Sequence, residues 1–487
     1  MPREGSAGDD AAFHDGESSL GDWMDRQFHL SAAAMLQSVS AIHLVKERPG
    51  FGQTIRPVKG SVLASPMIAS YDPDPDYFFH WLRDSAIVID AVGVLIEERA
   101  LARDALDDIR DFLRFSLALC DLDGRGALRS GASLRAANPA FQQYMRSAPE
   151  LSGVVGDAVF GETRVNPDGT LDITKWARPQ HDGPALRALT VMRLWRRGFF
   201  DDPDTRAVAR ALVDADLAFT HRRWTAPSFD IWEEELGHHY YTRLVQYAAL
   251  ADGAEWLDEI AGDDCAHAYR TASREIARRL DGHWDADRGF YLSRLGATAD
   301  NMAKELDCAT ILAVIHARRG AGPHSVTDPR ALATLGRLEN LFIQDYPINK
   351  SLPPGRGPAM GRYSGDLYYS GGAYYFSTLA AAEFFFRLAG AVAGRAQVPA
   401  ALDGQSLLAG VIADPSDGHS GFDALISRGD GFMATVRAYA PASGALSEQF
   451  DRATGRQTSA KNLAWSHAAL ITAVASRRAA FRAVDPL

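Results

Sequence analysis

The stretch RDSAIVIDAVGVLIEERA, residues 83–100, carries the strongest signal for the fold of this chain. Its apolar residues recur every three or four positions, which places them on one face of an α-helix. Eleven further segments, rich in Ala, Leu and Arg, repeat this periodicity and also predict helices. They cover residues 30–45, 105–120, 183–198, 205–224, 239–257, 266–284, 301–320, 329–345, 372–390, 405–413 and 462–478.

The segments between these helices are rich in Gly, Pro and Asp. Three of them exceed the usual length of a loop, at residues 61–76, 137–180 and 346–370. Long loops on a regular helical scaffold commonly carry binding and catalytic residues. One β-hairpin is predicted within WDADRGFYLSRL, residues 284–295, with its turn at Asp287–Gly289.

No Pro- or Ser-rich linker divides the chain. We therefore expect one all-α domain over residues 21–487, after a polar, flexible tail of residues 1–20. About twelve helices would form six helical hairpins that close into a ring, with the long loops gathered on one face. An apolar content of 46% is sufficient for the core of such a domain.

Charge and cysteine content exclude several classes of partner. The formal net charge is −11, so no surplus of Lys and Arg exists to neutralise phosphates, and we expect no nucleic-acid partner. Cys120, Cys265 and Cys308 lack the spacing of a metal site and favour a reducing compartment. We expect neither a bound metal nor a cofactor.

The N-terminal sequence MPREGSAGDDAAFHDGESS is polar and acidic, without the basic start and apolar run of a signal peptide. The chain also lacks a run of about 18 uninterrupted apolar residues, so no membrane-spanning helix is expected. These features predict a soluble, cytoplasmic protein.

Aromatic and charged residues gather in DPDYFFHWLRDSA, residues 74–86. Tyr77 and Trp81 stand beside Arg83 and Asp84, and an adjacent Arg and Asp offer donors and acceptors at fixed positions. Sugars need such polar pairs for their hydroxyls and aromatic faces for their C–H surfaces. The alternative is a helix N-terminus with a local ion pair.

A similar combination of aromatic and charged residues recurs in KWARPQHDGPALRA, residues 175–188. Trp176 and Arg178 precede a predicted helix and are candidate site residues. Asp182 stands where a helix N-cap is expected, two residues before Pro184, and we predict that structural role for it.

Three consecutive glutamates follow a tryptophan in FDIWEEELG, residues 229–237. On a helix, successive side chains point about 100° apart, so at most one or two of Glu233, Glu234 and Glu235 can face a ligand. A carboxyl group against the apolar wall of Trp232 would have a raised pKa, as a general acid requires. The alternative is an acidic first turn that offsets the helix dipole.

A second carboxylate, Glu448, lies in ALSEQFDRATGRQTSAKNLAWSHAAL, residues 445–470, ahead of a helix expected to begin near Ala460. Hydrolysis of a glycosidic bond uses two carboxyl groups, one as acid and one as base or nucleophile. Glu233 and Glu448 are therefore the candidate pair.

Five blocks in order make the chain resemble glycoside hydrolase family 15, the glucoamylase family, over roughly residues 60–480. The resemblance implies an (α/α)6 barrel. It also implies exo-hydrolysis from non-reducing ends, with inversion and release of β-D-glucose. The blocks are PDYFFHWLRDSA, WARPQHDGPALRA, FDIWEEELGHHYYT, YPINKSLPPGRGPAMGRYSGDLYYSGGAYYFSTLAAAE and LSEQFDRATGRQTSAKNLAWSHAAL.

The resemblance also implies roles for individual residues. Glu233 falls on the general acid and Glu448 on the general base that activates water, while Glu235 is expected to face solvent. Arg83 and Asp84 fall on residues that hold the outermost glucose. The remaining sugar contacts that it implies are aromatic, at Tyr77, Trp81, Trp176, Trp232, Tyr374 and Trp465, and polar, at Arg178, Glu234 and Arg362.

Two departures from the family pattern leave the linkage open. Many fungal glucoamylases have Asn-Pro-Trp where this chain has Gly372-Ala373-Tyr374, and small polar residues where it has His238 and His239. These positions lie where the second sugar would be held. The family default is α-1,4 cleavage, but α-1,6 (isomaltose-type or dextran) or trehalose cleavage is also compatible. The two histidines can equally be ordinary helix-start residues.

The expected substrate is a soluble α-linked gluco-oligosaccharide, because the chain has no room for a starch-binding module beside the barrel. Two rival functions are a glycoside phosphorylase, which would need only one carboxylic acid and against which the presence of Glu448 argues, and a non-catalytic sugar-binding protein. The sequence does not predict an oligomeric state.

Overall fold

The computed structural model describes residues 19–71, 73–130, 137–260, 265–296, 299–394 and 418–484. Helix α1 begins at Leu20, after a capping box in which Ser19 accepts the N–H of Asp22. Residues 1–18, most of the predicted tail, lie outside the described part of the chain.

Within the described residues, six helices form a closed inner ring in which each contacts the next and the last returns to the first. The outer layer has six helices, and inner and outer helices alternate strictly along the chain. The inner helices are α2 (Leu82–Glu97), α8 (Asp182–Arg196), α10 (Tyr240–Ile260), α12 (Ala309–Ala317), α14 (Tyr375–Ala393) and α16 (Ala464–Val484). The outer helices are α1 (Leu20–Leu36), α3 (Leu106–Leu119), α9 (Pro203–Arg223), α11 (Cys265–Asp281), α13 (Pro329–Asp345) and α15 (Gly418–Tyr439).

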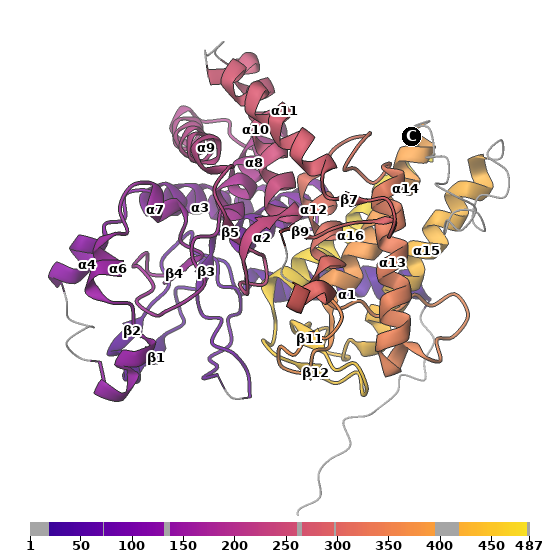
Figure 1. Ribbon diagram of the computed structural model, residues 1–487, viewed down its shortest axis with the longest axis horizontal. Coiled ribbons are helices and arrows are strands. Elements are labelled where there is room, and N and C mark those ends of the chain that lie inside the picture. The colour runs from indigo at the N-terminus through magenta and orange to yellow at the C-terminus, as the bar shows by residue number, and fades with distance from the viewer. Residues whose placement is uncertain are drawn as a thin grey trace, which may run out of the picture.

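This arrangement is an (α/α)6 barrel, as the helix count predicted. Figure 1 shows the outer helices α9 and α11 at the top and α13 and α15 on the right, around α2, α12 and α16. Short connections join α8 to α9 and α10 to α11, which pack as antiparallel neighbours, whereas α1 packs on α16 from the other end of the chain.

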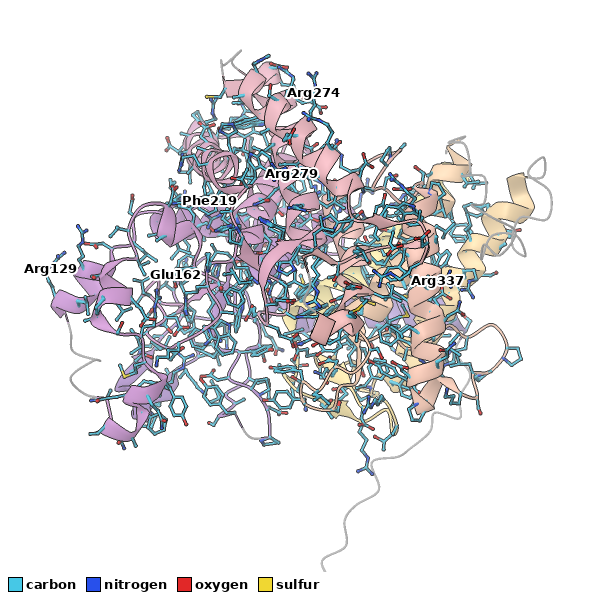
Figure 2. All side chains as sticks on the ribbon, viewed as in Figure 1. Arg129, Glu162, Phe219, Arg274, Arg279 and Arg337 are labelled. Atoms are coloured by element: carbon cyan, nitrogen blue, oxygen red, sulfur yellow. The ribbon has the colours of Figure 1, made fainter. Side chains whose placement is uncertain are left out.

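Burial distinguishes the two layers. The outer helix α11 buries one apolar stripe and turns Arg274 and Arg279 outward, as Figure 2 shows at the top of the molecule. The inner helix α14 is mostly apolar, with a buried Glu383 that forms an ion pair with Arg387. Among the described residues it is the one helix long and apolar enough to cross a membrane, and 72% of that stretch is buried inside the barrel.

Three helix predictions need correction. The segment predicted at residues 30–45 leaves the helix at Leu36, and Val39 instead pairs with Val62 in an isolated bridge. The segment predicted at residues 301–320 splits into a 3-10 turn, Ala299–Glu305, and α12, because the Asp307 carboxylate accepts the N–H of Ala309 and stops the turn there. The segment at residues 405–413 lies outside the described residues.

Helix α15 is the eleventh barrel helix in chain order and was not predicted. Four glycines interrupt its periodicity. At two of them, close contacts show why a larger residue would not fit. A Cβ at Gly429 would lie 2.3 Å from the Phe386 ring of α14, and one at Gly431 would lie 2.6 Å from the Gly355 carbonyl. The glycines thus permit close packing while they weaken the local helix signal.

Short strands tie the connections together at the ends of the helices. The predicted hairpin is confirmed, because β7 (Trp284–Asp285) pairs antiparallel with β8 (Phe290–Tyr291), and Gly289 has a φ of +70° in the turn. The other pairs and triplets are β1 (Lys46–Arg48) with β2 (Gln53–Ile55), β3 (His80–Trp81) with β4 (Arg164–Val165), β5 (Ser228–Phe229) with β6 (Leu236–His239) and β9 (Arg294–Leu295), and β10 (Ala373–Tyr374) with β11 (Gln449–Phe450) and β12 (Gln457–Thr458).

The long connection between α3 and α8 folds into a small lobe on the left of Figure 1, together with β1 and β2. It brings β4 back beside β3, just before α2. The lobe contains α4 (Gly124–Ser130), α6 (Ala148–Ser152) and α7 (Asp157–Phe160), and the remaining 3-10 turns among the described residues are Pro49–Phe51, Arg103–Ala105, Pro139–Tyr144 and Pro347–Asn349.

Candidate active site

The N-terminal ends of the inner helices converge on one site, because alternate helices run in opposite directions. Arg83 at the start of α2 contacts Asp182 at the start of α8. The Arg83 guanidinium also lies 5.4 Å from the ring centroid of Trp465 at the start of α16. Trp232, ahead of α10, packs against Tyr374, ahead of α14. The predicted gathering of functional loops at one face is therefore confirmed.

Glu233 lies in a tight turn between β5 and β6, and not in a helix as its acidic neighbours suggested. Its backbone has a φ of +66°, which is rare for a residue with a side chain. The Asp230 carboxylate holds the turn by accepting the N–H groups of Glu234 and Glu235 at 2.8 and 2.9 Å. Strained backbone of this kind is common where a functional side chain must be aimed.

Three N–H donors contact the Glu233 carboxyl group. The Trp81 indole donates to Oε1 at 2.7 Å, the Trp176 indole donates to Oε2, and Arg83 Nη2 lies 3.3 Å from Oε1. The indole of Trp232 donates to the buried Asp307 at 2.8 Å, and an apolar wall from Trp232 beside Glu233 stays a prediction. Glu233 therefore sits among polar donors.

Arg83 is buried and surrounded by three carboxylates. It lies 3.2 Å from Asp84, 3.2 Å from Asp182 and 3.3 Å from Glu233. Burial raises the pKa of Asp84 to about 6, although the charge of Arg83 opposes this shift. Asp182 is the first residue of α8 and caps nothing, so its predicted N-cap role is wrong.

Glu448 immediately precedes β11 and approaches the same site from the other side. Its carboxyl accepts the Tyr77 hydroxyl at 3.2 Å and the Ser459 hydroxyl. Burial raises its pKa to about 7, against the opposing effects of Arg362, Ser459 and Tyr77. The Tyr77 ring packs 5.1 Å from the Trp81 ring that contacts Glu233, so this aromatic pair lies between the two carboxyl groups.

The comparisons with known proteins agree with this geometry. The pattern of the family described as "Glycosyl hydrolases family 15" matches residues 51–475. The chain belongs to this family. It is accordingly a glycoside hydrolase of the glucoamylase type.

Individual relatives cover most of the chain at modest identity. A probable glucoamylase of Schizosaccharomyces pombe is 28% identical over 95% of this chain and 93% of the relative. Glucoamylase 1 of Rhizopus oryzae is 27% identical, over 96% and 73%. The solved structure of Hormoconis resinae glucoamylase has a TM-score of 0.75 at 26% identity, over 94% of this chain and 74% of that chain. Saccharomycopsis fibuligera glucoamylase, 23% identical, shares the fold with a TM-score of 0.75, over 95% and 96%.

In this family 15 site the three adjacent glutamates diverge. Glu234 contacts Arg362 at 3.1 Å, the Tyr363 hydroxyl at 2.7 Å and Lys304 at 2.7 Å. Glu235 forms an ion pair with Arg294 and does not simply face solvent as expected. The turn thus sends each carboxylate to a different partner.

Two predicted sugar contacts lie behind the first layer of the site. Tyr374 is fully buried, and its hydroxyl is bonded to the Gln449 amide at 2.6 Å. Arg178 forms ion pairs with Glu162 at 2.7 Å and Asp172 at 2.9 Å. In these positions both residues support others, and direct sugar contact by either stays a prediction.

Arg164 is a buried site residue that sequence reasoning missed. Its guanidinium lies 3.5 Å from the Trp176 ring centroid and 4.9 Å from that of Trp81, the two rings whose N–H groups contact Glu233. Asp172 holds it from behind at 2.9 Å. Arg164 lies outside the recognisable motifs, so no local pattern pointed to it.

The two histidines after the acid turn have structural partners. His239 Nε2 is bonded to the Glu235 carbonyl at 3.0 Å, and burial lowers the pKa of His239 to about 4. His238 pairs with Leu295 in the β6–β9 ladder. In the described part of the chain, no group of three or more His, Cys, Asp or Glu side chains is arranged to hold a metal ion.

Proposed function

We propose that the protein is an inverting, exo-acting α-glucosidase that releases β-D-glucose from the non-reducing ends of soluble α-linked gluco-oligosaccharides. Glu233 acts as the general acid and Glu448 as the general base. The observation that carries this proposal is their placement on either side of the Tyr77–Trp81 pair. An inverting hydrolase needs two carboxyl groups separated by about 6.5–9.5 Å, with a water between one of them and the sugar.

The reaction begins when Glu233 gives its proton to the glycosidic oxygen. The bond from this oxygen to the anomeric carbon then breaks, and positive charge develops on the sugar ring. The N–H groups of Trp81, Trp176 and Arg83 stabilise the carboxylate that Glu233 becomes. These donors are fixed before the reaction and need no reorganisation.

Glu448 completes the reaction by taking a proton from the attacking water. The water oxygen bonds to the anomeric carbon on the face opposite the leaving group, so an α-linkage yields β-glucose. The hydroxyls of Tyr77 and Ser459 fix the orientation of this carboxylate. A pKa of about 7 makes Glu448 a strong base for a carboxylate, and the ionised form is fully populated only above that pH.

Arg83 and Asp84 supply the polar surface that binds the outermost glucose. They are the charged residues at the start of α2, beside the acid, and burial strengthens hydrogen bonds from a sugar to either group. The next polar pair is formed by Glu234 and Arg362. It lies past Glu233, on the side where the second sugar would lie.

Proton NMR of the protein with maltose, isomaltose, trehalose and maltotriose tests the proposal. We expect β-glucose to appear before mutarotation, and the fastest substrate identifies the linkage. With maltotriose, where the cleaved end is the one glucose released first, early α-glucose would contradict the acid and base assignment; inversion on trehalose should instead give α- and β-glucose in equal amounts. Turnover that requires phosphate would indicate a phosphorylase. Sugar binding without turnover by the wild type would indicate a binding protein.

A further inference from the structure

A buried lysine connects the turn that carries Glu233 to the neighbouring Glu234. Lys304 comes from the 3-10 turn Ala299–Glu305, and its side chain is only 4% exposed. Its ammonium nitrogen lies 2.7 Å from the Asp230 carboxylate and 2.7 Å from the Glu234 carboxylate. A charged group is costly to bury unless it is paired, so an ammonium shared by two carboxylates fixes all three groups in one arrangement.

Asp230 links Lys304 to the backbone of the proposed acid. One carboxylate oxygen of Asp230, Oδ1, accepts the N–H groups of Glu234 and Glu235. The other oxygen, Oδ2, accepts a hydrogen bond from Lys304. The Asp230 carbonyl also accepts the N–H of Glu233 at 3.0 Å, within the turn whose φ is positive at Glu233. A backbone conformation of this kind persists only where its surroundings hold it. Lys304 therefore orients the carboxylate that maintains the turn.

Glu234 is the second partner of the lysine, and its carboxylate is held by three groups. Arg362 donates to Oε1 at 3.1 Å. The Tyr363 hydroxyl donates to Oε2 at 2.7 Å, the same oxygen that Lys304 contacts. Without the ammonium, the carboxylates of Glu234 and Asp230 would repel each other in a partly buried, weakly screened setting. Lys304 thereby keeps Glu234 beside Arg362, where the second sugar would lie.

Lys304 is charged, and its position is fixed at both ends. Burial opposes its charge, but Asp230 and Glu234 raise its pKa above the ordinary value, so the ammonium stays protonated. The Lys304 carbonyl accepts the Ser293 hydroxyl at 2.5 Å. Ser293 directly precedes β9, which pairs with β6, the strand that follows the turn of Glu233. The backbone and the ammonium of the lysine are therefore both attached to the sheet that flanks Glu233.

We propose that Lys304 is a positioning residue, which couples binding of the second sugar at Glu234 to the placement of Glu233 at the glycosidic oxygen. The inference rests on the proposed glucosidase function. Lys304 acts through Asp230 and Glu234, and itself needs no contact with the sugar or the reacting atoms. A leaving group that fills the second sugar position and must be protonated depends on this coupling. Fluoride does neither, so hydrolysis of α-glucosyl fluoride should not depend on it.

Lys304→Met tests the proposal, because it keeps the apolar stem and removes the charge. We expect kcat/KM to fall about 100-fold for the fastest of maltose, isomaltose and trehalose, since a small displacement of a reacting group costs that much. Hydrolysis of α-glucosyl fluoride should stay within about threefold of wild type. A merely structural role would lower both rates together, because a misfolded fraction hydrolyses neither substrate. If Lys304→Met does not fold, Lys304→Gln, which still donates a hydrogen bond, should show the same selective loss to a smaller extent.

Arg288→Met is the matched control. Arg288 pairs at 2.6 Å with Glu305, the residue after Lys304, and at 2.6 Å with Asp285 in the β7–β8 hairpin. Loss of this more exposed cation should leave both rates within about twofold of wild type. Equal losses on the disaccharide and the fluoride in the Lys304 variants would overturn this inference alone. So would a wild-type rate on the disaccharide, or an equal selective loss in Arg288→Met. Failure of the wild type to hydrolyse maltose, isomaltose or trehalose would instead overturn the proposed function.

Discussion

The surroundings of Glu233 and Glu448 differ in the kind of donor that each carboxyl group receives. Glu233 meets two indoles and a guanidinium, which can only donate. Glu448 meets two hydroxyls, which can donate or accept. The first set favours a carboxylate that is left behind after proton transfer. The second set can adapt as a carboxylate gains a proton from water. The comparison supports the two roles without reference to any relative.

Removal of each carboxylate is the strongest way to break this comparison. Glu233→Gln and Glu448→Gln should each lower kcat for the preferred glucoside by about 10²–10⁴-fold, since general acid–base catalysis contributes that much. α-Glucosyl fluoride separates them, because fluoride leaves with little protonation. Glu233→Gln should hydrolyse the fluoride at near wild-type rate and Glu448→Gln should not. The reverse pattern would exchange the two roles.

The pH dependence of activity tests the surroundings of the proposed base, Glu448. Hydrogen bonds from Tyr77 and Ser459 lower the pKa of Glu448, so their loss in Tyr77→Phe or Ser459→Ala raises it. A higher pKa means that ionised Glu448 appears at higher pH. The acidic limb of log kcat/KM should therefore move upward in pH, with about a tenfold loss of activity below it.

Trp81→Phe is the matched variant on the acid side, because it removes one donor from Glu233 and keeps the ring beside Tyr77. Trp81→Phe should lower kcat by about tenfold, while the acidic limb of the log kcat/KM profile stays at the wild-type pH. A shifted limb in Trp81→Phe, or an unshifted one in both base-side variants, would contradict the separation of the two environments.

Glycine and alanine substitutions should affect the free energy of unfolding differently at Glu233 and Glu448, because their backbone conformations differ. At Glu233, φ is +66°, so Glu233→Gly should be more stable than Glu233→Ala by about 1 kcal/mol. Glu448 is not among the residues with positive φ, so Glu448→Gly should be less stable than Glu448→Ala by a similar amount. Urea unfolding of the four variants measures both differences. The same sign at both positions would show that the turn is not strained.

The smallest expected effect concerns the neighbour of the acid. Tyr363→Phe removes a 2.7 Å hydrogen bond to Glu234 but leaves Arg362 and Lys304 in place. We expect KM for a disaccharide to rise about threefold, with kcat and the pH profile unchanged. A change in kcat as large as that of Trp81→Phe would assign Tyr363 to the acid and not to the second sugar.

Helix periodicity predicted most of the barrel correctly. Residues 329–345 match α13, and residues 83–100 and 105–120 match α2 and α3 within a few residues. Helix α15 escaped detection because its glycines serve a contact with α14, and contacts between helices leave no local period. The turn that carries Glu233 was predicted to begin a helix, because a Glu-rich sequence is typical of a first helical turn.

Charge partners were the least predictable part of the site. Asp182 has the local features of an N-cap, yet it pairs with Arg83, which lies far away along the chain. The indole of Trp232 reaches Asp307, a contact that its place beside Glu233 in the sequence does not indicate. Arg164 supports both indoles that contact the acid, and nothing near it in sequence indicates this.

The sequence by itself determined the helical periodicity and the motifs that resemble family 15. These features are local, since each depends on residues a few positions apart. Only the tertiary structure decided which carboxylate meets which donor and where the Glu233 backbone has a positive φ. Those features arise because the inner helices begin at one end of the barrel and bring distant segments within hydrogen-bonding distance.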